Sequence, residues 1–148
     1  MVESALPLAG LRVLDISSFI AAPAAAVALG DWGADVIKIE GPEGDPNRTI
    51  MNDSPSYPKG DVNYPWQMDS RNKRSLVLDL KKPEARAALD RLIAVSDVLI
   101  CNFPPPVRDK LFCRIDLADL VAEIGCFARR GRICIEGLLL LGQRAVQK

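Results

Sequence analysis

The sequence of 148 residues contains no histidine. This absence excludes zinc sites built from cysteine and histidine, catalytic triads that use histidine, and histidine as a general base. The four cysteines, Cys101, Cys113, Cys126 and Cys134, form no CxxC pair, so we expect each to be a small buried apolar residue rather than a metal ligand or nucleophile. No metal site is predicted, and any chemistry must use carboxylates, backbone amides, lysine or arginine.

The sequence also lacks an excess of charge and a long apolar run. Lysine plus arginine and aspartate plus glutamate number 19 each, which gives no reason to expect nucleic acid or a membrane as a partner. The apolar stretch at residues 21–30 is shorter than the roughly 20 residues of a membrane span. The first residues, Met1 to Ser4, lack the basic start of a signal peptide. We therefore expect a cytoplasmic protein, with the mitochondrial matrix as the alternative.

Strand and helix patterns alternate along the chain. Apolar residues make up 49% of the sequence, which is typical of a globular domain with one core. Short apolar runs predict strands, and prolines suited to a first helical turn, followed by helix-forming residues, predict helices. The predicted strands are residues 11–16, 36–40, 76–80 and 98–101, and the predicted helices are residues 23–30 and 83–95. The fold class is α/β, a Rossmann-like open parallel sheet built from two βαβ units joined by a long loop.

The long loop, residues 41–75, has no periodic pattern and holds five prolines. A stretch of this length without a pattern is uncommon inside a compact domain and is usually functional, for example a lid or an inter-subunit arm. Plain disorder is the alternative. We expect residues 41–64 to be irregular, exposed and poor in internal contacts, whereas Tyr64, Trp66 and Met68 favour docking on another surface.

Ligands of open parallel sheets bind beyond the carboxyl ends of the strands. The loop after the first strand runs into a helix amino terminus, which can bind an anionic phosphate. This loop has no G-x-G-x-x-G motif and no glycine between Gly10 and Gly30. Glu40 ends the second strand, where dinucleotide enzymes keep a ribose-binding acid, but the missing glycines disfavour a nicotinamide dehydrogenase.

The densest basic cluster is Arg71, Lys73 and Arg74, with Lys81 and Lys82 close behind. Two interpretations stay open. The cluster could capture phosphate, because arginine matches phosphate oxygens bidentately, or it could be a solvated strand edge. Its place between the long loop and a strand slightly favours phosphate capture.

Five segments, in order and at matching spacing, resemble the opening of a known family. They are residues 8–15 with Ala21-Ala22-Pro23, residues 33–40, residues 44–48, residues 72–81 and residues 94–103. Together they resemble the amino-terminal part of the family III CoA-transferases, which include formyl-CoA transferases, carnitine and bile-acid CoA-transferases and α-methylacyl-CoA racemases. The resemblance covers about residues 6–112. It implies an amino-terminal CoA-binding domain over residues 1–112 and a divergent tail, truncated or rearranged, over residues 113–148.

The resemblance implies particular CoA contacts. Gly41 stands where some members carry a basic residue. CoA or acyl-CoA would be a substrate rather than a bound cofactor, and a carboxylic acid would be the second substrate. The implied CoA-binding residues are Ile20, Ala21, Leu78, Asp79, Leu80, Lys81, Asn102, Phe103, Pro104 and Lys110.

In the family, an aspartate attacks the acyl-CoA thioester and forms a mixed anhydride and then an aspartyl-CoA thioester. We find no counterpart of this aspartate, so no catalytic residue is assigned. Asp116 and Asp119 are the acids nearest the end of the resemblance, and Asp15 is expected to brace the loop that follows it. A CoA-transferase that is catalytically incomplete in this chain is therefore the main hypothesis. The alternative is a non-catalytic CoA-binding or degraded fragment, and the lesser alternative is an acyl-CoA racemase.

The resemblance also implies a homodimer whose subunits interlock like chain links. A solitary copy would expose an apolar patch, and self-association is expected from it.

Overall fold

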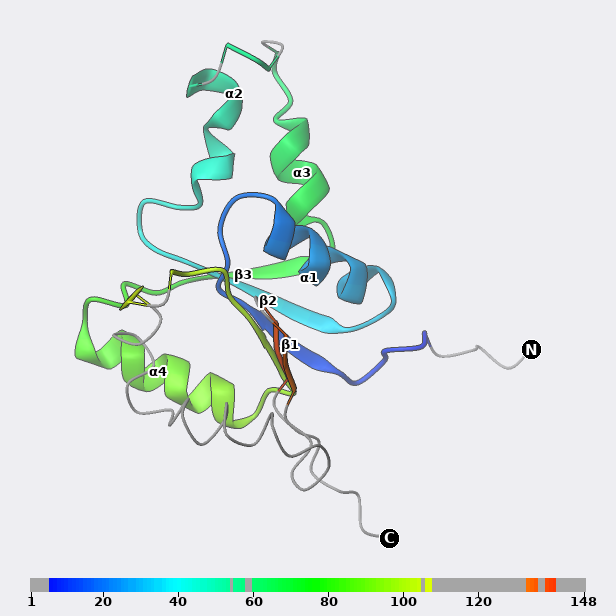
Figure 1. Ribbon diagram of the computed structural model, residues 1–148, viewed down its shortest axis with the longest axis vertical. Helices are drawn as coiled ribbons and strands as arrows, with labels where there is room; N and C mark the ends of the chain where they lie inside the picture. The colour runs from blue at the N-terminus through cyan, green and yellow to red at the C-terminus, as the bar shows by residue number, and fades with distance from the viewer. Residues whose placement is uncertain are drawn as a thin grey trace, which may run out of the picture.

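The computed structural model describes residues 6–53, 55–57, 60–104, 106–107, 133–135 and 138–140. Its central elements alternate between strand and helix (Figure 1). They are β1 Arg12–Asp15, α1 Ala21–Asp31, β2 Asp35–Glu40, β3 Lys73–Val77, α4 Pro83–Ala94 and β4 Val98–Ile100. The four strands run parallel in the order β3-β2-β1-β4. The predicted α/β class and open parallel sheet are confirmed.

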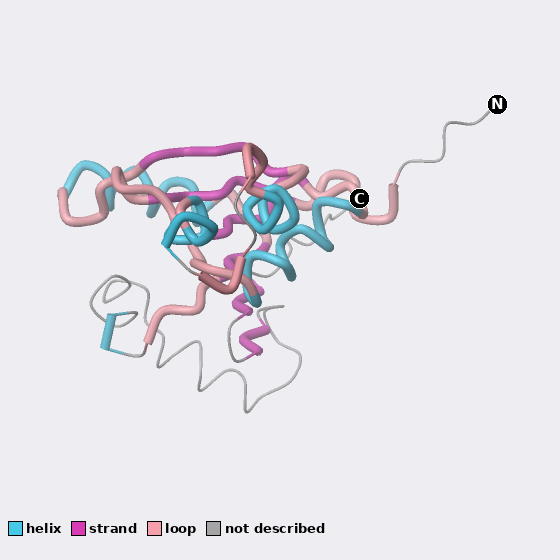
Figure 2. Tube along the Cα trace, turned by 90° about the horizontal axis from the view of Figure 1, so that it is seen from above, coloured by secondary structure: helices cyan, strands magenta, loops and turns pink. Residues whose placement is uncertain are grey.

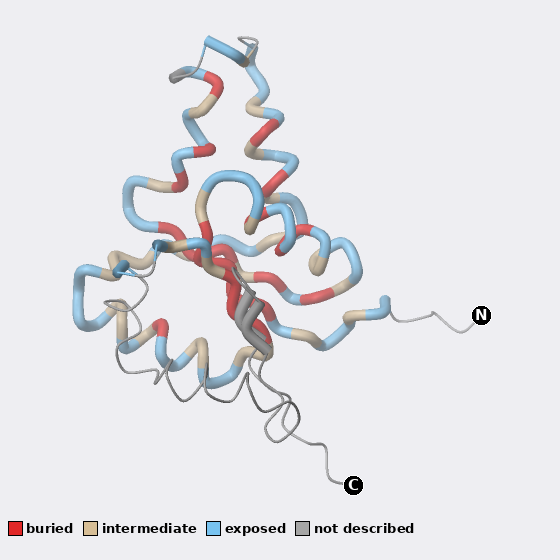
Figure 3. Tube along the Cα trace, in the orientation of Figure 1, coloured by how far each residue is buried: buried red, intermediate tan, exposed pale blue. Residues whose placement is uncertain are grey.

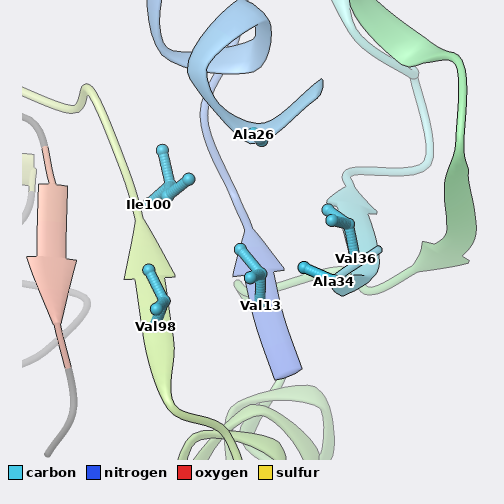
Figure 4. Close-up of a cluster of buried hydrophobic side chains, with 6 residues drawn as sticks. All are labelled: Val13, Ala26, Ala34, Val36, Val98 and Ile100. Carbon is cyan, nitrogen blue, oxygen red and sulfur yellow. The ribbon is translucent and has the colours of Figure 1, made fainter. Parts of the chain in front are cut away.

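A helix covers each face of the sheet. Both faces carry apolar side chains that have to be buried, because successive residues of a strand point to opposite sides. On one face, Ala26 of α1 packs over Val13, Val36, Val98 and Ile100 (Figure 4). On the other, the helix α4 covers a second apolar cluster, whose buried residues are Leu14, Ile16, Ile39, Leu89 and Leu99. Seen from above, the helices lie to either side of the strands (Figure 2), and burial is concentrated in the strands (Figure 3).

A glycine with a left-handed backbone follows the end of the helix α1. Gly33 has φ +100°, and the N–H of Ala34 donates to the carbonyl of Leu29 at 3.0 Å. A Cβ at Gly33 would lie 2.5 Å from the Cβ of Leu6. Glycine is therefore required both by the backbone conformation and by the close approach of the chain that precedes β1.

The third strand begins three residues earlier than the sequence predicts. The prediction was residues 76–80, whereas β3 pairs with β2 from Lys73 to Val77. β2 ends at Glu40, opposite Val77, so the pairing stops there apart from a bond of 2.8 Å from the N–H of Leu78 to the Glu40 carbonyl. Leu78 and Leu80 still pack against the core, which is why the apolar run extends beyond the strand.

The expectation that residues 41–64 are irregular, exposed and poor in internal contacts holds only in part: most of the described residues are exposed, but the segment contains helical turns and buried side chains. The segment holds a short 3-10 helix, η1 Pro46–Arg48, and α2 Ile50–Asp53, and α3 Tyr64–Ser70 follows. The helices α2 and α3 stand out together from the sheet (Figure 1). Asp45 and Asn63 cap η1 and α3 by accepting bonds from backbone N–H groups. Asp45, Asn47, Met51, Pro65 and Asp69 are buried. Because most of these residues are polar, no apolar periodicity revealed the structure.

The tail adds two strands that the sequence did not predict. β5 Ile133–Ile135 and β6 Leu138–Leu140 pair antiparallel, and β6 pairs antiparallel with β4. The sheet order is therefore β3-β2-β1-β4-β6-β5. Lys110, Cys113, Asp116, Asp119 and Cys126 lie outside the described residues. Among the residues that are described, the longest helices fall short of the length and apolar character needed to cross a membrane.

Candidate functional site

Two adjoining pockets open at the carboxyl ends of the parallel strands, where sheet ligands are expected. The larger has a volume of about 590 Å³ and lies between the ends of β2 and β3 and the start of α4. The smaller, about 130 Å³, lies beside the loop that follows β1. Gly41, Leu80 and Phe103 line both pockets. The larger volume is in the range of about 300–1,000 Å³ that small-molecule sites occupy.

Part of the predicted CoA-binding set lies at the larger pocket. Leu78, Asp79, Leu80, Lys81 and Phe103 line it. Lys81 is exposed, and its N–H donates to the Asp79 carboxylate at 3.1 Å. The pocket therefore combines apolar side chains with charged groups at its rim.

The remaining predicted residues lie elsewhere. Ile20 is exposed and Ala21 begins α1, and neither lines the two pockets. Pro104 is exposed. The side chain of Asn102 bonds both backbone groups of Ser18, so it holds the loop after β1 to the loop after β4. Lys110 is outside the described residues.

Arg86 lines the larger pocket, although the sequence analysis had not singled it out. It is half-buried, and its Nε donates to the carbonyl of Leu80 at 2.7 Å. The helical spacing could have found it, because Arg86 precedes the buried Leu89 by three residues and so shares its face of α4. The backbone contact fixes one edge of the guanidinium beside the pocket.

The basic cluster is occupied by internal ion pairs, which contradicts the interpretation as a phosphate site. Arg71 pairs with Asp31 at 2.7 Å, and Arg74 pairs with Asp35 at 2.7 Å. The hydrogen bonds from Arg71 and from a neighbouring asparagine hold the pKa of Asp31 below its usual value. The cluster also lies at the start of β3, away from the carboxyl ends where the pockets open.

Lys73, the third member of the cluster, is buried. Its Nζ donates to Asp15 Oδ2 at 2.8 Å and to the carbonyls of Pro23 and Asp69 at 2.8 and 2.7 Å. Burial lowers the pKa of Lys73 below its usual value, and the charge of Lys38 adds to this effect, although Asp15 acts in the opposite direction. Lys73 thus ties β3 to α1 and α3.

A second buried lysine joins β2 to the loops around it. Lys38 is 2% exposed, and its Nζ lies 2.9 Å from Asp45 Oδ2 and 3.8 Å from Asp15 Oδ2. It also donates to the carbonyl of Ser17. Asp15 accepts from the N–H of Ser17 at 3.0 Å and from its hydroxyl. Asp15 does brace the loop after β1, as the sequence predicts.

Glu40 is not available as a ribose-binding acid. Its carboxylate accepts two bonds of 2.7 Å from Arg48, and the N–H of Asp45 donates to it at 3.0 Å. Burial alone would raise the pKa of Glu40, but these bonds outweigh it and hold the pKa below its usual value. The Glu40 bond in turn raises the pKa of Arg48, whose guanidinium lies 3.9 Å from the centre of the Trp66 ring.

The described part of the chain contains no cluster of three or more potential metal ligands. Its two carboxylates at the smaller pocket, Glu40 and Asp45, are both engaged by cations. The site that remains is the pair of adjoining pockets, lined by polar and apolar residues, at the carboxyl ends of the parallel strands. Fold and site together define an open-sheet α/β protein with a pocket at the carboxyl edge of its sheet, which is where such sheets bind their ligands.

The comparisons with known proteins name the family. The model of the CoA-transferase family III matches residues 8–122. The chain belongs to this family.

The curated relatives carry the names of several CoA-transferases. The chain is 41% identical over 109 residues to the succinyl-CoA–L-malate CoA-transferase alpha subunit of Chloroflexus aurantiacus, covering 73% of this chain and 25% of that protein. It is 42% identical over 103 residues to the formyl-CoA:oxalate CoA-transferase of Rhodopseudomonas palustris, covering 69% of this chain and 23% of that protein. The chain thus spans about a quarter of the length of these relatives.

Solved structures agree with this assignment. A CAIB/BAIF family protein from Brucella suis matches with a TM-score of 0.63 and 36% identity, over 73% of this chain and 29% of that one. A hypothetical protein from Mycobacterium tuberculosis, Rv3272, matches with a TM-score of 0.63 and 34% identity, over 72% of this chain and 28% of that one. The parallel sheet with its flanking helices is therefore the part of the fold that this chain shares with them.

Proposed function

We propose that this chain forms the CoA-binding part of an enzyme that moves CoA from an acyl-CoA thioester to a free carboxylic acid. The observation that carries the proposal is the pocket of about 590 Å³ at the carboxyl ends of β2 and β3. Five residues that the resemblance implies as CoA contacts line it, namely Leu78, Asp79, Leu80, Lys81 and Phe103.

The chemistry of the pocket suits a ligand with an apolar portion and phosphate groups. Leu78, Leu80 and Phe103 offer apolar surface, and Lys81 and Arg86 offer cationic donors at the rim. Charged donors bind phosphate oxygens more strongly than neutral donors, and the planar guanidinium of Arg86 can bind two of them. We assign Arg86 and Lys81 to the CoA phosphates. Asn102, whose side chain is used internally, would contact CoA through its backbone.

The covalent steps need a carboxylate nucleophile. In the proposed reaction, the carboxylate oxygen bonds to the thioester carbonyl carbon and CoA leaves as the thiolate, which gives a mixed anhydride. The thiolate then attacks the carbonyl carbon of the enzyme carboxyl, which gives the aspartyl-CoA thioester and frees the first acid. Asp15, Glu40 and Asp45 are held by buried ion pairs. No residue of this chain matches the nucleophilic aspartate of the family, so we propose that another part of the whole enzyme supplies it.

These engaged carboxylates also favour a second candidate function, a module that binds CoA without turning it over. Mass analysis of peptides after incubation with acyl-CoA separates the two. An adduct on Asp15, Asp116 or Asp119 would show that this chain catalyses the transfer. We expect no adduct on the chain by itself.

We further propose a cytoplasmic enzyme whose whole form is a homodimer.

A titration of CoA by calorimetry tests the binding site directly. We expect Arg86→Ala to weaken binding by about 1.5–3 kcal/mol, or roughly ten- to a hundredfold, because a hydrogen bond from a charged group is lost. Lys81→Ala combined with Lys110→Ala should have a similar effect that shrinks at high salt.

Arg91→Ala is the matched control, because Arg91 lies on the same helix, is exposed and does not line the pocket. It should leave CoA affinity unchanged. Equal losses for Arg86→Ala and Arg91→Ala, or a wild-type chain without CoA binding, would contradict the proposal.

A further inference from the structure

The loop between β1 and α1 is held through its backbone to an unusual degree. Both backbone polar groups of each of its three central residues, Ser17, Ser18 and Phe19, are bonded to side chains. The N–H of Ser17 donates to Asp15 Oδ1 at 3.0 Å, and its carbonyl accepts from Lys38 Nζ. These two partners lie at the end of β1 and in β2, so the start of the loop is fixed to the centre of the sheet.

The rest of the loop is held from two other parts of the chain. The N–H of Ser18 donates to Asn102 Oδ1 at 2.9 Å, and its carbonyl accepts from Asn102 Nδ2 at 2.8 Å. The N–H of Phe19 donates to Asp45 Oδ1 at 3.1 Å, and its carbonyl accepts from Asn47 Nδ2 at 3.4 Å. Side chains after β4 and around η1 therefore complete the clamp.

Phe19 has a left-handed backbone with φ +65°. This conformation is disfavoured for a non-glycine residue by about 5- to 30-fold in population, equivalent to about 1–2 kcal/mol. Packing of the side chain does not explain it, because Phe19 is 51% exposed. The bonds from Asp45 and Asn47 to its two backbone groups are what compensates for the strain.

Asp45 is itself fixed in place. Its second carboxylate oxygen lies 2.9 Å from Lys38 Nζ, and its own N–H donates to Glu40 at 3.0 Å. Its first oxygen accepts from Phe19 and from the N–H of Asn47. Asp45 therefore links β2 to Phe19, so the position of this strained residue depends on the position of β2.

We propose that Asp45 is a positioning residue for CoA binding, which acts by holding Phe19 in its left-handed conformation. The inference rests on the proposed function. Ser17 and Ser18 line the smaller pocket together with Asp45, and Phe19 directs the chain from that pocket into the first turn of α1. A loop in which Phe19 relaxes to its ordinary conformation would shift Ser17 and Ser18 at the pocket wall. It would also move Ile20 and Ala21, which line neither pocket but which the resemblance implies as CoA contacts.

A double-mutant cycle on the full chain tests this role, with CoA titration and urea unfolding measured on each variant. Asp45→Ala should weaken CoA binding by about 5- to 30-fold, the population ratio that the left-handed conformation implies. Phe19→Gly in the same background should restore most of the affinity, because glycine adopts this conformation without help. Phe19→Gly alone reports what the ring itself contributes to binding.

Two further variants separate positioning from stability. Asp45→Asn keeps an oxygen acceptor for the N–H of Phe19 but loses the ion pair with Lys38, so we expect lower stability with CoA affinity retained. Asn47→Ala removes the other partner of Phe19 without removing a charge, and it takes the place of Asp45→Ala in the cycle if that variant does not fold.

The role of Asp45 would be overturned if the losses of CoA affinity caused by Asp45→Ala and Phe19→Gly simply multiplied in the double variant, so that glycine restored nothing. The proposed CoA site would not be affected by that result. A wild-type chain that binds no CoA would overturn the proposed function, and this inference with it. Rescue by Phe19→Gly together with retained affinity in Asp45→Asn would establish the positioning role.

Discussion

Replacing Lys38 by methionine removes the cation at the centre of the buried network and keeps an unbranched side chain that is one atom shorter. Lys38 is 2% exposed, and its ammonium lies 2.9 Å from Asp45 and 3.8 Å from Asp15, whose side chains are 2% and 0% exposed. The variant leaves two carboxylates in the interior with fewer partners. We expect it to lose much more stability than an ordinary surface substitution.

The magnitude follows from the burial of all three groups. Breaking a buried ion pair by removing one partner destabilises by about 3–5 kcal/mol, because an uncompensated charge stays buried. Natural domains are stable by only about 5–15 kcal/mol, so the loss would be plain in a urea titration followed by circular dichroism. Arg74→Met is the matched control. The N–O distance of its ion pair with Asp35 is even shorter, 2.7 Å, but the two side chains are 65% and 46% exposed, so we expect a loss of about 0–1 kcal/mol.

Thermal unfolding provides a second check. Thermal melts of the same two variants should rank them in the same order. A deficit below about 1 kcal/mol for Lys38→Met, or one no larger than that of Arg74→Met, would refute this reasoning.

Three further outcomes are expected. Glu40→Gln should lower stability by about 1–2 kcal/mol at pH 7. Because the folded pKa of Glu40 is depressed, the wild-type advantage should be complete above the unfolded pKa of about 4.3 and should shrink in acid titrations as pH falls through the folded pKa. Gly33→Ala should destabilise more than Gly10→Ala in thermal melts, because both glycines have left-handed backbones but an added Cβ meets Leu6 only at Gly33; equal losses would contradict the clash. Val77→Lys should reduce self-association in sedimentation without loss of stability, because Val77 is 59% exposed on the edge strand β3; a wild-type chain that stays monomeric at all concentrations would remove the premise.

The sheet and its two main helices could be predicted because their buried residues are apolar. β1, β2 and β4 lie within the expected runs to within one or two residues, and α4 follows the apolar spacing at Leu89, Leu92 and Ile93. The segment from Gly41 to Ser70 could not be predicted in this way. It is organised by Asp45, Asn47 and their hydrogen bonds, and polar side chains give the same pattern in a sequence whether they are buried or exposed.

The candidate site shows the same division. The resemblance names Leu78, Lys81 and Phe103 as CoA contacts, and all three line the larger pocket. It also named Asn102, whose side chain instead bonds Ser18. The hydrogen-bond partner of this amide is set by the contact between two loops that are distant in sequence, and propensity and periodicity do not predict such contacts. Arg86, by contrast, could have been found from its helical spacing.

The clamp on the loop after β1 has a consequence for the order in which the protein folds. Two of its bonds, from Lys38 to the carbonyl of Ser17 and from the N–H of Phe19 to Asp45, join residues 21 and 26 positions apart. The bonds from Asn102 to Ser18 join residues 84 positions apart. Contacts of long sequence separation form late, because a longer loop must be closed first. We expect β1, α1 and β2 to assemble early with their charged residues paired, and Asn102 to close the loop only when β4 arrives.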